Sequence, residues 1–433
     1  MFDDVPGLDD LGDVRGRSVL VRADLNVPLR SAPTPGGPSL PAVADDFRVR
    51  AALPTIRWLV ERGAQVTVAS HLGRPGGRPD PALSMAPVRE LLQAFVPGVR
   101  VLENLRFDPG EESGDPAFGA QLVDGHDLYV NDAFGSCHRA HASVVYPPTV
   151  LPSAAGLLLR RELDALGRVL HAPAHPFTVV VGGAKVADKL GTIRALATLA
   201  DRVVIGGAMA FTFLAAQGHR VGASPVDEAA LDECRALLGP GTHVELPVDL
   251  VAVPTEGSRQ AGSSPEGRVV AGYVPPGWEA FDIGPATRER YARRITSART
   301  VLWNGPMGRF EDRRFAAGTA AVAAAVAHCT GFTVVGGGDT VTAVHQLGTA
   351  DRIGHLSTGG GAMLELIERG DLPGIAALRD ARRLLATAGA ASATRPGTSH
   401  GRPGRARPAG AGGDPVTLAA GAGGAVVHLD GLP

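Results

Sequence analysis

The chain has 433 residues, of which 44% are hydrophobic and 20% are charged, a composition typical of a globular protein. This length predicts two domains, and a net charge of −2 favours neither a nucleic-acid partner nor a membrane surface. No apolar run approaches the ~20 residues of a membrane span, and the acidic start MFDDVPGLDD lacks the basic region of a signal peptide, so we expect a cytoplasmic protein.

Four β-branched runs in the first half of the chain are followed by polar or basic side chains. In chain order they are SVLVRADLN (18–26), AQVTVASHLGR (64–74), VRVLENLRF (99–107) and DLYVNDAFG (127–135). Helical patterns alternate with these runs, which predicts a largely parallel sheet whose strand ends meet at one edge. The residues at these ends would form a basic rim suited to a small phosphorylated acid: Asp24, Asn26, His71, Arg74, Asn104, Arg106, Asp132, Arg139 and His141.

The next segment, PSAAGLLLRRELDALGRVL (152–170), has helical periodicity and good helix formers, and we expect it to join the two domains. Four further strand runs follow, and most of them end in glycines. They are FTVVVGGAK (177–185), DRVVIGGAM (201–209), RTVLWNGPMG (299–308) and FTVVGGGDT (332–340). Glycines at strand ends let backbone N–H groups and helix N-termini approach phosphates closely, which predicts a nucleotide site.

Lysine is nearly absent from this chain. Lysines and arginines total 42, yet only Lys185 and Lys189 are lysines, both within VVVGGAKVADKLG. Arginine presents a planar fork, whereas lysine is a compact point charge, so the exchange fails where geometry is tight. The two lysines are therefore candidates for a functional site.

Two familiar phosphate-binding patterns are missing from the sequence. It contains neither G-x-x-x-x-G-K-[ST] nor a G-x-G-x-x-G after a strand, which excludes a P-loop and argues against a dinucleotide fold. Beyond about Ala381 the composition changes to Ala, Gly, Pro, Ser and Arg without periodicity, which predicts a disordered tail.

Nine strings together closely resemble phosphoglycerate kinase. They occur in that family's order between about residues 15 and 380: VRADLNVPL, ASHLGRP, ENLRF, YVNDAFGSCHRAHAS, LPSAAG, GGAKVADKLG, LWNGPMGRFE, VVGGGDT and HLSTGGGAMLE. The resemblance implies reversible transfer of the ATP γ-phosphoryl group to the carboxylate of 3-phosphoglycerate. The products are 1,3-bisphosphoglycerate and ADP, in glycolysis and gluconeogenesis. It also implies a cytoplasmic monomer that uses ATP/ADP and Mg²⁺ with small-molecule substrates.

The resemblance implies an α/β fold of two doubly wound, Rossmann-like parallel-sheet domains joined by a helix and hinge. We expect five segments: a 3-phosphoglycerate-binding domain (1–155), an interdomain helix (156–170), a Mg-nucleotide domain (171–360), a segment returning to the first domain (361–382) and a disordered tail (383–433).

By the same resemblance, the substrate's hydroxyl and carboxylate are held by Asp24 and Asn26. Its phosphate would bind to His71, Arg74, Arg106 and Arg139, since arginines offer parallel donors. Arg48 would lie at the transfer point, and Lys189 and Lys185 would assist transfer from the nucleotide side. The implied nucleotide-binding set is Gly183, Ala184, Lys189, Ala208, Ala280, Asn304, Glu311, Gly337, Gly338, Asp339 and Thr340, with Asp339 carrying Mg²⁺.

The sequence departs from the family's pattern in several places. Ala208 and Ala280 stand where the family usually has glycine, and the stretch between Val88 and Leu102 is shorter than usual. Two alternatives therefore stay open beside a phosphoglycerate kinase. One is a paralogous kinase acting on another small carboxylate in specialised metabolism, and the other is a non-catalytic nucleotide-binding homologue.

Overall fold

The computed structural model of this chain describes residues 2–34, 37–255 and 267–382, all within one compact unit, Met1–Ala390. The predicted tail, 383–433, lies outside the described residues. Along the described chain, no helix is long and apolar enough to cross a membrane.

The first half of the chain forms a five-stranded parallel sheet in the order β5-β4-β1-β6-β7. Its strands are β1 (Ser18–Ala23), β4 (Gln65–Ala69), β5 (Arg100–Val101), β6 (Leu128–Asp132) and β7 (Ser153–Ala155). The four predicted runs become β1, β4, β5 and β6. Strands β1, β4 and β6 are largely buried because strands inside a parallel sheet are covered on both faces, whereas β5 is a two-residue edge strand that begins with the exposed Arg100.

Six helices accompany this sheet. Their bounds are α1 (Phe47–Glu61), α2 (Ala86–Phe95), α3 (Pro109–Ser113), α4 (Pro116–Val123), α5 (Ala142–Val145) and α6 (Pro147–Val150). The apolar faces of α1 and α2 pack against one side of the sheet, where Ile56, Leu59, Val88 and Leu92 are fully buried.

The second half forms a six-stranded parallel sheet in the order β10-β9-β8-β14-β15-β16. Its strands are β8 (Phe177–Val181), β9 (Arg202–Ile205), β10 (Val244–Glu245), β14 (Thr300–Asn304), β15 (Phe332–Gly336) and β16 (His355–Leu356). The helices are α8 (Leu190–Ala197), α9 (Met209–Ala216), α10 (Leu231–Leu237), α11 (Pro285–Thr296), α12 (Ala317–His328), α13 (Gly338–Gln346) and α14 (Gly361–Arg369). The predicted α/β class with two parallel sheets is confirmed.

Two antiparallel elements were not predicted from the sequence. One is the three-stranded sheet β12-β11-β13, formed by β11 (Asp249–Pro254), β12 (Arg268–Ala271) and β13 (Trp278–Ile283). The other is a hairpin of β2 (Leu29–Thr34) and β3 (Gly37–Val43). The hairpin lies in a proline-rich stretch, and prolines argue against strands because they lack a backbone donor.

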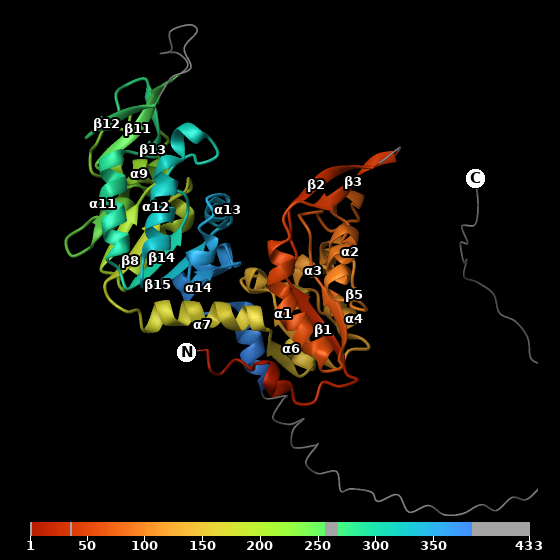
Figure 1. Cartoon of the computed structure of the whole chain (residues 1–433). Coiled ribbons are helices and arrows are strands. Elements are labelled where there is room, and N and C mark those ends of the chain that lie inside the picture. Colours follow the sequence, from red (N-terminus) through yellow and green to blue (C-terminus); the bar gives the residue numbers. More distant parts are fainter. Residues whose placement is uncertain (1, 35–36, 256–266, 383–433) are drawn as a thin grey trace, which may run out of the picture. The chain divides into compact units, whose positions relative to one another are not determined.

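Helix α7 (Leu157–His171) occupies the segment expected to join the domains (Figure 1). Its buried Glu162 accepts hydrogen bonds from the Thr358 backbone N–H and hydroxyl, at 2.6 and 2.8 Å, and from His355 Nε2 at 2.8 Å. Further along the chain, Gly374 N donates to Cys137 O at 2.9 Å. These contacts tie residues late in the sequence to elements of the first half, while the expected domain boundaries stay a prediction.

Candidate active site

The order of the first sheet brings the predicted basic rim together. Strands β5, β4, β1 and β6 are neighbours, so the residues after them share one edge. Asn26 Oδ1 accepts a hydrogen bond from Gly73 N at 2.9 Å, and Arg106 Nη1 donates to Gly73 O at 2.7 Å. Residues that follow three different strands are thereby tied to one turn.

Arg48 lies in the first turn of α1 and forms an ion pair with Asp24. Burial opposes ionisation of the Asp24 carboxyl. The charge of Arg48, with that of Arg22 and a hydrogen bond from the Asn26 backbone N–H, outweighs burial and holds the pKa of Asp24 below its ordinary value. Asp24 is therefore an ionised acceptor at neutral pH, and its ion pair places Arg48 at this edge of the sheet, while the role of Arg48 at a transfer point stays a prediction.

Arg74 and Arg139 lie at the exposed part of the rim. Arg139 Nε donates to His138 Nε2 at 3.1 Å, and no carboxylate of the described chain lies within ion-pair distance of Arg74 or Arg139. By contrast, Arg106 is half-buried and pairs with Glu112 at 3.1 Å. The two exposed guanidinium groups are thus available to an anion from solution.

A buried arginine that sequence reasoning missed lies beneath the rim. Arg22, on β1, is fully buried, and its Nε donates to Ser143 Oγ at 2.9 Å. Its other nitrogens contact Ala23 O at 2.5 Å, Ser136 Oγ at 3.3 Å and His71 Nδ1 at 3.1 Å. One feature of the sequence could have indicated it: Arg22 is the charged residue in an otherwise apolar strand. A charge buried in this way requires polar partners, so such a residue predicts a buried network.

Arg22 determines the protonation of His71. A guanidinium group only donates hydrogen bonds, so His71 Nδ1 must accept and the imidazole proton resides on Nε2. Burial and the charge of Arg22 both hold the pKa of His71 well below its usual value. The imidazole is neutral at pH 7, and the positive charge of the rim comes from its arginines.

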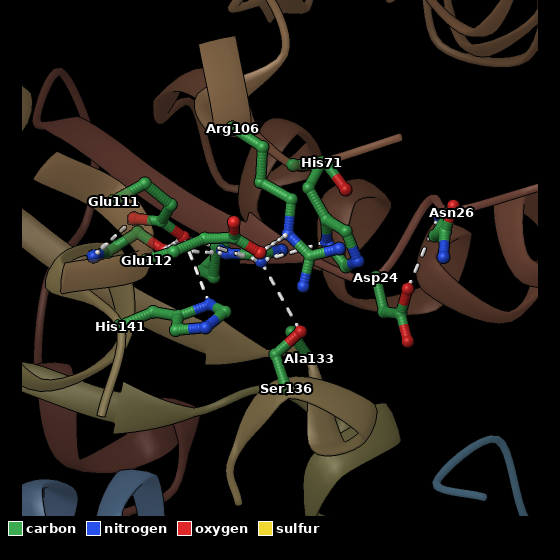
Figure 2. Close-up of polar contacts among 12 residues, drawn as sticks. Asp24, Asn26, His71, Arg106, Glu111, Glu112, Ala133, Ser136 and His141 are labelled. Carbon is green, nitrogen blue, oxygen red and sulfur yellow. Dashed lines mark hydrogen bonds and ion pairs between the residues drawn. The ribbon is translucent and has the colours of Figure 1, made fainter. Parts of the chain in front are cut away.

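The counter-charge of Arg22 is Glu111, which is also fully buried. Glu111 Oε1 lies 3.9 Å from Arg22 Nη2 and accepts from Ser143 Oγ at 2.6 Å, while Oε2 accepts from Ser143 N at 2.9 Å. His141 Nδ1 lies 3.7 Å from Glu111, and burial, with the charges of Arg106 and Arg22, lowers the pKa of His141 to about 4. Figure 2 shows Glu111 and His141 joined by these contacts.

The second parallel sheet carries a pocket of about 590 Å³ at the ends of β8, β14 and β15. Its walls include nine residues predicted for the nucleotide side: Gly183, Ala184, Lys185, Lys189, Asn304, Gly337, Gly338, Asp339 and Thr340. Gly305 and Gly337, with φ of 99° and 94°, adopt the left-handed conformation that favours glycine. A Cβ at Gly305 would also collide with the Gly182 carbonyl, so the chain segments meet too closely for any larger residue.

Lys189 is half-buried at the end of a short 3₁₀ helix, η5 (Ala187–Lys189). Its Nζ donates to Gly182 O at 2.7 Å and to Asn304 O at 3.4 Å. Burial lowers the pKa of Lys189 to about 8, against the opposing charges of Asp339 and Asp188. Lys185, in contrast, extends into solvent with 83% of its side chain exposed. The two lysines are therefore unequal, and Lys189 belongs to the pocket interior.

Two groups in this pocket have the polarity of an anion site. Asn304 Nδ2 is buried and has no hydrogen-bond partner within the described chain, so one amide donor is available to a ligand acceptor. Helix α13 starts at the pocket with Gly337 as its N-cap, which leaves its first backbone N–H groups directed at the same space. Lysine, amide and helix N-terminus are donors that bind phosphate oxygens.

Asp339 in the first turn of α13 is the predicted Mg²⁺ ligand, and it also lines the pocket. No cluster of three or more His, Cys, Asp or Glu in the described part of the chain could hold a metal by itself. Mg²⁺ usually binds through one or two carboxylates, waters and the phosphates of its substrate. A single carboxylate, Asp339, beside donors suited to phosphate oxygens fits that mode of binding.

Three residues predicted for the base and ribose do not line this pocket: Ala208, Ala280 and Glu311. Ala280 is only 2% exposed and packs in an apolar cluster with Phe211, Leu250 and Ala252, while Ala208 is half-buried against the same cluster. Glu311 is exposed in the loop after β14. Their contacts with a nucleotide stay a prediction.

Arg48 and the start of α13 share a small cavity of about 150 Å³. Its walls include Phe47 and Arg48 from the first half of the chain and Gly338, Val341 and Thr358 from the second. The rings of Phe47 and His345 meet edge to face at 5.2 Å between centroids. The cationic side chain of Arg48 therefore lies close to the N-terminus of α13, which also lines the 590 Å³ pocket at the ends of β8, β14 and β15.

Comparison with known proteins agrees with this geometry. The family model for phosphoglycerate kinase matches residues 8–100 and 96–370. The chain is 50% identical over 392 residues to the phosphoglycerate kinase of Rubrobacter xylanophilus, covering 84% of this chain and 96% of that protein. It is 46% identical to that of Desulforudis audaxviator, covering 85% of this chain and 98% of that protein.

Among solved structures, the phosphoglycerate kinase of Coxiella burnetii is similar, with a TM-score of 0.75 and 34% identity over 86% of this chain and 98% of that one. The family match spans both parallel sheets, the basic rim and the glycine-lined pocket. The chain therefore belongs to the phosphoglycerate kinase family.

Proposed function

We propose that this chain catalyses the reversible transfer of the ATP γ-phosphoryl group to the carboxylate of 3-phosphoglycerate. A carboxylate oxygen forms a bond to the γ-phosphorus while the bond from that phosphorus to the β,γ-bridging oxygen breaks, and ADP leaves with the electron pair. The observation that carries the proposal is the pocket in which Lys189, Asn304 Nδ2 and the N-terminus of α13 converge.

On the substrate side, we assign the phosphate to the arginines of the rim. Arg74 and Arg139 are exposed and without a carboxylate partner in the described chain, while Arg106 is held against Gly73. His71 adds an Nε2–H donor, since Arg22 occupies its Nδ1. Asp24 and Asn26 would bind the hydroxyl and carboxylate, which agrees with Asp24 being an ionised acceptor.

On the nucleotide side, Lys189 and the N–H groups of Gly338 and Thr340 would hold the phosphates. Asp339 would carry Mg²⁺, which supplies charge neutralisation and alignment of the β- and γ-phosphates. Ala208, Ala280 and Glu311 are assigned to the base and ribose on the family resemblance, and Lys185 to an assisting role at the pocket mouth.

Catalysis in this account consists of alignment and charge compensation. The attacking carboxylate is already ionised at pH 7, so no general base is needed. Arg48 and Lys189 approach the transferred group from opposite sides and offset the charge on its oxygens, while the surrounding protein excludes water from ATP. Because His71 is neutral, this charge compensation comes from arginine and lysine.

We further propose that the enzyme acts as a cytoplasmic monomer, as expected from the family resemblance. Its substrates would be small molecules only, without a nucleic-acid or membrane partner. Light scattering coupled to size-exclusion chromatography measures the mass directly, and a single species near 44.5 kDa is the expected result.

Steady-state kinetics with a panel of carboxylates test the substrate. With MgATP, 3-phosphoglycerate should give a kcat/KM at least about a hundredfold above those of glycerate, 2-phosphoglycerate and 3-(phosphonooxy)propanoate, which lacks the 2-hydroxyl group. The missing or displaced group removes charge-assisted hydrogen bonds to the arginines of the rim, or leaves the largely buried Asp24 side chain without its hydroxyl partner, and both losses weaken binding of the analogue.

A higher kcat/KM for another carboxylate would favour the paralogous kinase instead. No turnover with any acceptor, together with normal MgADP binding by calorimetry, would favour a non-catalytic nucleotide-binding protein.

A further inference from the structure

A second cavity in the C-terminal half is separate from the phosphate pocket and has no role in the proposed reaction. It has a volume of about 390 Å³ and shares no lining residue with that pocket. It lies between the end of α9, the connection from β10 to β11, the end of β12 and helix α11. The volume is within the range of sites for small organic ligands.

Aliphatic side chains and charged groups both line this cavity. Leu214, Val221, Leu250, Val270 and Val274 contribute aliphatic surface, and the ring of Tyr273, which is 54% exposed, stands at the rim. Water in contact with such walls is released when an apolar ligand body enters, which favours binding.

The charged groups around the cavity leave an excess of positive charge. Asp249 caps α11, accepting hydrogen bonds from Ala286 N at 2.9 Å and Thr287 N at 2.8 Å. Glu245 is surrounded by three arginines, Arg290 at 2.7 Å, Arg294 at 3.1 Å and Arg202 at 3.6 Å. Both carboxylates of the walls therefore already have partners within the protein. Asp249 accepts backbone hydrogen bonds, and the single negative charge of Glu245 is opposed by three arginines.

Arg220 is an exposed cation in the wall of this cavity. Its guanidinium carbon lies 5.6 Å from the centre of the Tyr273 ring, and none of the described carboxylates comes within ion-pair distance of it. His219 lies beside it on the cavity wall. A guanidinium group held over an aromatic ring is oriented in advance to donate to an anion.

We infer that this cavity binds a compact organic anion with an apolar body, of the class of aromatic carboxylates and sulfonates. The apolar body would fill the space between Leu214, Leu250 and Val270, and the anionic group would pair with Arg220. The site is independent of the phosphate pocket, so a nucleotide and this anion bind together.

Calorimetric titration with the aromatic sulfonate 8-anilinonaphthalene-1-sulfonate tests the inference on the full chain, with saturating MgADP to occupy the phosphate pocket. Two matched pairs of variants serve as test and control. Arg220→Ala is compared with Arg268→Ala, whose guanidinium lies over Trp278 at 5.5 Å outside the cavity. Val270→Phe fills the cavity, whereas Val269→Phe adds the same ring on the opposite face of β12.

We expect one sulfonate per chain, with Arg220→Ala weakening binding about tenfold or more, the value of one charge-assisted hydrogen bond. Val270→Phe should weaken binding similarly, while Arg268→Ala and Val269→Phe change it less than about twofold. The neutral analogue N-phenyl-1-naphthylamine should bind at least about tenfold more weakly than the sulfonate.

Equal effects within either pair of variants would overturn the inference, as would equal affinity for the neutral analogue. Displacement of the sulfonate by MgADP would assign it to the phosphate pocket and would also overturn the inference. None of these outcomes depends on turnover, so the proposed kinase activity is tested separately.

Discussion

Replacing Lys189 with methionine is expected to lower kcat by about a thousandfold or more, the scale of a cationic group that stabilises phosphoryl transfer. Lys189 Nζ donates to the Gly182 and Asn304 carbonyls inside the glycine-lined pocket that we propose to bind phosphates. Steady-state kinetics with saturating MgATP and 3-phosphoglycerate measure the loss. Turnover within about tenfold of the wild type would show that Lys189 does not act on the transferred group.

Two further substitutions show why this position is lysine. Lys189→Arg should also lose most of its turnover, because Lys189 Nζ donates to two carbonyl oxygens, Gly182 O at 2.7 Å and Asn304 O at 3.4 Å, and a wider planar guanidinium group cannot take the same position. Lys185→Met should lose far less than either variant, because the Lys185 side chain is 83% exposed. Comparable losses at both lysines would contradict the distinction.

The pH dependence of nucleotide binding reports the same group. Burial lowers the pKa of Lys189 to about 8, so the free protein loses this positive charge as the pH rises above 8. The affinity for MgADP should then fall by up to about tenfold per pH unit, the limit for one proton. In Lys189→Met the affinity should be lower and independent of pH over the same range, which separates Lys189 from other titrating groups.

Removing Arg22 is expected to destabilise the protein more than any surface change. Arg22→Met leaves Glu111 buried without its counter-charge, and we expect a loss of about 3–5 kcal/mol in the free energy of unfolding. Urea denaturation followed by circular dichroism measures it. The matched control is Arg194→Met, which breaks an exposed ion pair with Glu233 and should cost less than about 1 kcal/mol.

The double variant Arg22→Met, Glu111→Leu separates pairing from packing. If the cost of Arg22→Met comes from an isolated buried carboxylate, removing Glu111 as well should restore part of the lost stability. Two results would show that Arg22 and Glu111 are not a coupled charge pair. The first is a double variant whose loss in the free energy of unfolding equals the sum of the two single losses. The second is a loss from Arg22→Met no larger than that from Arg194→Met.

Sequence patterns predicted the two sheets because strands buried on both faces are continuous β-branched runs. They also predicted the rim, since residues such as Asn26, His71 and Arg106 directly follow such runs and neighbouring parallel strands end at the same edge. Lys189 was found from the scarcity of lysine. At these positions the local sequence pattern is enough to predict where a residue lies in the fold.

The buried network could not be assembled from the sequence. Arg22 and Glu111 are far apart along the chain, and they meet only in the folded protein, where Glu111 of α3 lies 3.9 Å from Arg22 on the central strand β1. The hairpin β2–β3 was missed because prolines dominate its sequence, and β11–β13 because its short strands lack a distinctive pattern. Both depend on tertiary pairing that overrides local preference.

The glycine-to-alanine positions show a different limit. Ala208 and Ala280 were assigned to the base from the family pattern, yet the Ala280 methyl packs among Phe211, Leu250 and Ala252. The sequence alone does not tell whether an alanine methyl at such a position points toward a ligand or into an apolar cluster, because both cases give the same residue pattern.

Trapping of the acyl phosphate tests the central claim most directly. The protein is incubated with MgATP, 3-phosphoglycerate and hydroxylamine, which converts an acyl phosphate into a hydroxamate, and both ADP and hydroxamate are quantified. Transfer to the carboxylate predicts one hydroxamate per ADP, dependent on 3-phosphoglycerate and abolished in Lys189→Met. Formation of ADP without hydroxamate, or no dependence on 3-phosphoglycerate, would contradict the account.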